Sequence, residues 1–75
     1  MSSTLGRTVK DAIKLSGIPI AEVSRMIDLS ASAMSGRLAG RTPFLCDELV
    51  RISIIVDVSV RDLLADWEAE MGWAV

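Results

Sequence analysis

The sequence contains no histidine and a single cysteine, Cys46, among its 75 residues. Without these side chains the chain lacks the usual zinc ligand sets, a Ser-His-Asp triad, a Cys-His pair and any internal disulfide. No plausible nucleophile and base pair is left. We therefore expect no metal, no cofactor and no enzymatic activity.

Long apolar runs are also missing. No segment reaches the roughly 18 apolar residues of a membrane span. Residues 1–7 lack the basic start and apolar stretch of a secretory leader. We expect a cytoplasmic protein, in the host cytoplasm if a phage encodes it, with no membrane partner and no small-molecule ligand.

The length and the charge suggest one small domain with two different sides. A chain of 75 residues holds a single core and buries only about 60% of its unfolded surface, so a second copy of the chain could add stability. Residues 1–61 hold eight basic and six acidic residues, a net charge of +2. Residues 62–75 hold four acids and no base, a net charge of −4. The acidity therefore belongs to the C-terminal segment.

Start and stop signals predict five short helices with no internal repeat. Thr8 and Asp11 fit a capping box, so the first helix is expected to begin there and to end before Gly17. We expect residues 1–6 to be a flexible segment, residues 7–70 to form the domain and residues 71–75 to be a tail.

The next two helices are predicted over residues 20–27 and 31–38. Pro19 suits the start of the first of them. Asp28 tolerates a left-handed turn, and Ser30 is a suitable N-cap for the second. An apolar set at helical spacing then predicts a fourth helix within residues 44–56: Leu45, Leu49, Ile52 and Val56.

Residues 52–58 are rich in β-branched side chains and could form a strand by propensity alone, but we favour the helix. Cys46 falls between apolar positions of this helix and is expected to be a buried, inert thiol. Ser59 and Asp62 fit a second capping box, which predicts a fifth helix over residues 60–70.

The helices over residues 20–27 and 31–38 match a helix-turn-helix pattern. Ser24 is small enough for a close crossing, and Asp28 suits the bend. The same apolar spacing also fits an ordinary helical hairpin. Five segments further along the chain favour the first interpretation: Gly36-Arg37-Leu38, Gly40-Arg41-Thr42-Pro43, Asp47-Glu48-Leu49, Val58-Ser59-Val60 and Leu63-Leu64.

In this order, the segments over residues 8–66 resemble the lambda-repressor-like, or XRE-type, DNA-binding domain, especially regulators of actinobacteria and their phages. The resemblance implies a compact all-α domain of five helices. It also implies a transcriptional regulator that binds operator DNA, similar to phage Cro or small immunity repressors.

The resemblance also implies which residues contact double-stranded DNA. Those expected to face bases are Ala31, Ser32, Ser35 and Gly36, and those expected near the phosphate backbone are Ser30, Arg37 and Arg41. Arg37 stands where the family usually has an apolar residue. Small side chains offer little bidentate readout of bases, so we expect specificity to depend on DNA shape and on Arg37.

The C-terminal segment has two interpretations. Trp67 could close the core while the last residues fray, or an apolar set could form a homodimer contact: Trp67, Met71, Trp73 and Val75. The alternative function is a protein-interaction module of antitoxin or accessory-subunit type, in which the acidic C-terminal helix binds a basic partner.

Overall fold

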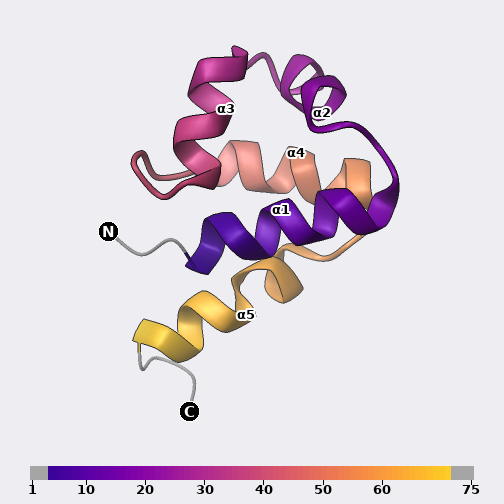
Figure 1. Ribbon diagram of the computed structural model, residues 1–75. Helices are drawn as coiled ribbons and strands as arrows, with labels where there is room; N and C mark the ends of the chain where they lie inside the picture. Colours follow the sequence, from indigo (N-terminus) through magenta and orange to yellow (C-terminus); the bar gives the residue numbers. More distant parts are fainter. Residues whose placement is uncertain (1–3, 72–75) are drawn as a thin grey trace.

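The computed structural model describes residues 4–71, apart from the side chains of Asp66, Glu70 and Met71. This part of the chain contains five α-helices and no strand (Figure 1). They are α1 (Thr4–Ser16), α2 (Ile20–Met26), α3 (Ala31–Leu38), α4 (Cys46–Val56) and α5 (Val60–Met71). None of these five helices combines the length and the apolar content that a membrane crossing requires.

Helix α1 is the centre of the fold, because it contacts each of the other four helices. Helices α2 and α3 lie on one side of α1 and α5 on the other (Figure 1). The buried apolar residues come from all five helices and the turn after α2: Val9, Ile13, Val23, Ile27, Met34, Leu49, Ile52, Val56 and Leu63. The acidic helix α5 meets α3 near the end of α3, where Arg37 lines the same hollow as Leu64 and Trp67.

The predicted bounds of α2, α3 and α5 agree with the structure to within one residue. The β-branched stretch within residues 52–56 is helical, as favoured from the sequence. Ile52 and Val56 recur at helical spacing after Leu49, and all three are buried in the core. Burial of this stripe outweighs a β propensity of about 1 kcal/mol or less per residue.

The predicted start of the first helix is wrong. Helix α1 begins at Thr4, and the Thr8 hydroxyl donates a hydrogen bond to the Thr4 carbonyl within the helix, at 3.1 Å. Residues 4–6 of the expected flexible segment are therefore helical, while residues 1–3 lie outside the described chain. Gly6 is buried, and a Cβ there would collide with the Leu38 carbonyl. The missing side chain lets the first turn of α1 pack against the end of α3.

The predicted burial of Cys46 is also wrong. Cys46 is exposed, and Leu45 before it is 58% exposed. The reason is that α4 begins at Cys46, so the buried stripe of this helix starts at Glu48 and Leu49. The three positions before the stripe, Leu45, Cys46 and Asp47, all face solvent.

Candidate nucleic-acid interface

Residues 27–30 connect α2 to α3 through a tightly bonded turn. Asp28 adopts the left-handed conformation, with φ 60°, which an aspartate tolerates better than most residues. The buried Ser24 accepts the Leu29 amide on its carbonyl at 2.9 Å, and the Ser30 hydroxyl accepts the Ala33 amide at 3.1 Å. The predicted positive φ of Asp28 and N-cap at Ser30 are both confirmed.

The exposed face of α3 consists of short side chains. Ala31, Ser32 and Ser35 are all exposed, whereas Met34 points into the core and is 1% exposed. Ala39 continues the same face one turn beyond Ser35. Alanine and serine let a helix backbone approach another surface closely, and each serine hydroxyl can both donate and accept a hydrogen bond.

Gly36 does not belong to this face. The loop after α3 folds back over it, and the Gly36 carbonyl accepts the amides of Arg41 at 2.9 Å and Thr42 at 3.4 Å. The residue is buried, and a Cβ built on it would lie 3.6 Å from the Thr42 hydroxyl. The structure therefore does not bring the expected base contact at Gly36 together with Ala31, Ser32 and Ser35. Arg41 is exposed beside it.

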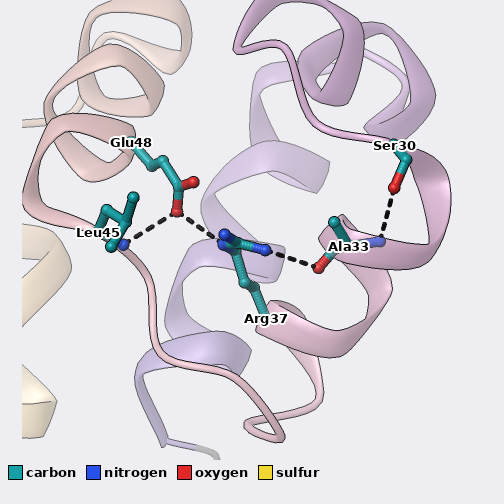
Figure 2. Close-up of polar contacts among 5 residues, drawn as sticks. All are labelled: Ser30, Ala33, Arg37, Leu45 and Glu48. Atoms are coloured by element: carbon teal, nitrogen blue, oxygen red, sulfur yellow. Dashed lines mark hydrogen bonds and ion pairs between the residues drawn. The ribbon is translucent and has the colours of Figure 1, made fainter.

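Arg37 points toward α4 rather than toward solvent (Figure 2). Its Nε lies 2.7 Å from Glu48 Oε1, and the two side chains are only 15% and 9% exposed. Glu48 Oε1 also accepts the Leu45 amide at 2.9 Å, and the Arg37 guanidinium donates to the Ala33 carbonyl at 3.4 Å. Arg37 thus ties the end of α3 to the first turn of α4.

This ion pair corrects the expected role of Arg37. A guanidinium that is neutralised and largely buried has little charge left to offer a phosphate. The resemblance leads us to expect an apolar residue at position 37. The structure explains how an arginine fits there, because Glu48 neutralises its charge. We therefore leave Arg37 out of the candidate interface and regard it as an anchor of α3.

A hollow of about 420 Å³ lies where α1, α2 and α3 meet. Ala31, Ser35 and Ala39 line it, and Lys10 of α1 lies at the same hollow. Sequence reasoning missed Lys10. Its proximity to α3 depends on how two helices distant in the chain pack, so no local signal could have revealed it.

Trp67 lies at a second, mainly apolar hollow of about 330 Å³. This hollow also involves Leu5 of α1, Phe44 of the loop before α4 and Leu64 of α5. Trp67 belongs to the set of residues expected to form the dimer contact, and it is half-buried at this hollow. The Met71 side chain, Trp73 and Val75 lie outside the described residues.

No protein family model, no curated protein and no solved structure matches the chain. The function is therefore argued from the geometry and the charge of the chain itself.

Proposed function

We propose that this protein binds double-stranded DNA as a sequence-specific transcriptional regulator, with α2 and α3 as the helix-turn-helix of a lambda-repressor-like domain. One observation carries the proposal. The exposed face of α3 is made of Ala31, Ser32 and Ser35, and it is held in place by the bonded turn at Ser24 and Asp28. A helix that projects only small side chains fits the major groove closely.

In this proposal each group on α3 has a defined part. The serine hydroxyls of Ser32 and Ser35 donate to or accept from base edges, and the Ala31 methyl contacts a thymine methyl. The first-turn amides of α3 that Ser30 does not cap, together with the exposed Arg41, hold the phosphate backbone. The protein bound at the operator then blocks access of RNA polymerase or of a competing repressor.

The proposal includes a two-fold dimer on DNA. One α3 offers too few contacts for a specific site, whereas two copies about 34 Å apart read two half-sites of a palindrome. Helix α5 lies on the opposite side of α1 from α2 and α3 (Figure 1). In this proposal that side, which carries the acidic end of the chain, faces away from phosphate. The apolar hollow at Trp67 supports a contact between copies on that side.

A charge-matched pair of variants tests the proposed interface. Ser32→Glu places a carboxylate on the exposed face of α3, and Ala65→Glu places the same charge on the exposed face of α5. Gel shifts with duplex DNA that flanks the protein's own gene, and with random duplex, are measured at low and moderate salt. We expect Ser32→Glu to weaken binding at least about tenfold, because a carboxylate near phosphate is strongly repelled. Ala65→Glu is expected to bind like the wild type.

Two results would contradict the proposal. If the wild-type protein shifts neither duplex at low salt, the protein does not act on duplex DNA. If the two glutamate variants lose affinity equally, α3 does not form the interface.

One observation favours the alternative, a protein-interaction module of antitoxin or accessory-subunit type. The apolar hollow at Trp67 adjoins the acidic helix α5, so an apolar and basic segment of a partner fits this side by charge and by chemistry. Binding of such a partner would be insensitive to Ser32→Glu and sensitive to Ala65→Glu. The same two variants therefore separate the two functions.

A further inference from the structure

The positive charge that remains available for a ligand is concentrated on α1. Three of the eight basic residues form ion pairs with described acids: Arg25 with Glu22, Arg37 with Glu48, and Arg51 with Asp28 and Asp47. The remaining five make no ion pair with a described side chain: Arg7, Lys10, Lys14, Arg41 and Arg61. Three of these five belong to α1.

The three cations of α1 lie on one face of the helix. At 100° per residue, Arg7, Lys10 and Lys14 fall within an arc of about 60°. All three are exposed, while Val9 and Ile13 on the buried side are fully enclosed. Because α1 packs against every other helix, the backbone positions of these three residues are fixed relative to α3.

This face adjoins the exposed face of α3. Lys10 lies at the same hollow as Ala31 and Ser35, and Gly6, about one turn before it, packs against the end of α3. The acids of α1 and α2 do not cancel this charge. Asp11 borders this face, about 40° around α1 from Arg7 and about 60° from Lys14, but it forms no ion pair with a described side chain. Glu22 of α2 is paired with Arg25.

We propose that Arg7, Lys10 and Lys14, which we call the basic face of α1, bind the phosphate backbone that flanks the groove entered by α3. This inference rests on the proposed function and assigns a second contact to the same DNA. Lysine and arginine neutralise phosphate charge and release condensed counterions, and such contacts orient a protein on a duplex without reading its sequence. The basic face adds to the phosphate contacts of Arg41 and of the first turn of α3, and it supplies positive charge that the paired Arg37 does not.

Neutral variants of the two lysines test the basic face. Lys10→Gln, Lys14→Gln and the double variant are compared with Arg61→Gln, which removes an exposed cation of α5 that pairs with no described side chain. Affinity for operator and random duplex is measured by fluorescence anisotropy across a range of salt concentrations. Because the dimer carries each substitution in both copies, each lysine substitution removes two phosphate contacts. It is expected to reduce the steepness of log affinity against log salt by about 2 and to weaken binding to both duplexes alike. Arg61→Gln is expected to leave the slope unchanged.

A charge-conserving variant separates charge from packing. Lys10→Arg is expected to keep the wild-type salt slope, and circular dichroism is expected to show unchanged helix content in every variant. Suppose that the wild type binds duplex DNA, but the lysine variants keep its salt slope or lose no more affinity than Arg61→Gln. The basic face then does not contact DNA, while the proposed function stands. If the wild type binds no duplex DNA, both the proposed function and this inference fail.

Discussion

The turn between α2 and α3 and the turn between α4 and α5 are built from the same parts. In each, an aspartate in the left-handed conformation follows the helix, with φ 60° at Asp28 and φ 57° at Asp57. In each, a serine two residues later caps the next helix. The Ser30 hydroxyl accepts the Ala33 amide, and the Ser59 hydroxyl accepts the Asp62 amide, both at 3.1 Å.

The two turns also close with the same backbone bond. The Leu29 amide donates to the carbonyl of Ser24 at 2.9 Å, and the Val58 amide donates to the carbonyl of Ser53 at 3.0 Å. Both of these serines are buried. No internal repeat is predicted from the sequence, but residues 24–30 and 53–59 share one short pattern: serine, two variable residues, an apolar residue, aspartate, an apolar residue and serine. The helices on either side of the two turns differ, so the repetition is confined to the turns.

The helices that begin after the two turns display different side chains, and this difference carries the proposed function. Helix α3 exposes small side chains at Ala31, Ser32 and Ser35, whereas α5 exposes the charged Arg61 and Asp62 in its first turn. The shared turn therefore fixes the entry of a helix and does not specify a ligand. The proposed contact with DNA rests on the side chains displayed on α3 and on the basic face of α1 beside it.

The largest expected effect breaks the anchor of α3. Arg37→Ala leaves the Glu48 carboxylate largely buried without its partner, which typically costs about 3–5 kcal/mol. For so small a domain we expect a loss of about 3 kcal/mol or more in the free energy of unfolding, measured by urea denaturation. Among the described ion pairs, no equivalent anchor holds α5, so the prediction tests a feature that separates the two regions.

An exposed ion pair provides the control. Arg25→Ala removes the partner of Glu22 on the surface of α2, where the side chains are 75% and 45% exposed, and it is expected to change stability by less than about 1 kcal/mol. The double variant Arg37→Met with Glu48→Leu removes both charges and is expected to be more stable than Arg37→Ala. If Arg25→Ala and Arg37→Ala lower the free energy of unfolding equally, Arg37 does not act as an anchor of α3.

The two turns also show which features could be read from the sequence. The caps at Ser30 and Ser59 and the bend at Asp28 depend on residues within a few positions, and all three predictions are confirmed. Ala31, Ser32 and Ser35, which the resemblance assigns to the DNA-facing side of the helix, are exposed in the structure. These features are local, so local reasoning suffices for them.

The features that sequence reasoning misses depend on distant partners. Thr8 matches a capping pattern, but α1 starts earlier, where Gly6 packs against Leu38 of α3. Arg37 is expected at DNA from the sequence because its partner, Glu48, lies on another helix. Lys10 escapes notice because only the packing of α1 brings it to the hollow beside α3. Periodicity and capping rules do not specify such contacts.

The next prediction uses the two caps as a matched pair. Ser30→Ala and Ser59→Ala each remove a hydroxyl that accepts a first-turn amide, so each is expected to lower the free energy of unfolding by about 1 kcal/mol. Only Ser30→Ala is expected to weaken DNA binding as well, because that serine opens the helix proposed to enter the groove. Binding is measured at a temperature where both variants are fully folded. A similar loss of DNA affinity in Ser59→Ala would place part of the interface at α5.

The smallest effect is expected from the two left-handed aspartates. Glycine relieves the strain of φ near +60°, but it also makes the unfolded chain more flexible, which opposes the gain by about 0.4–1 kcal/mol. Asp57→Gly is therefore expected to change stability by less than about 0.5 kcal/mol. Asp28→Gly is expected to be slightly less stable than Asp57→Gly, because it also removes a carboxylate that lies 3.9 Å from Arg51 in an exposed pair.

Alanine at the same two positions sharpens this last comparison. An alanine in the left-handed region lacks both the freedom of glycine and the local hydrogen bonding of aspartate, so Asp28→Ala and Asp57→Ala are each expected to destabilise the protein by about 1 kcal/mol. Urea denaturation of the four variants measures the difference between glycine and alanine at each turn. If that difference is the same at both positions, the two turns impose the same backbone constraint. If alanine is tolerated as well as glycine at only one position, that turn has a conformation available that the other lacks.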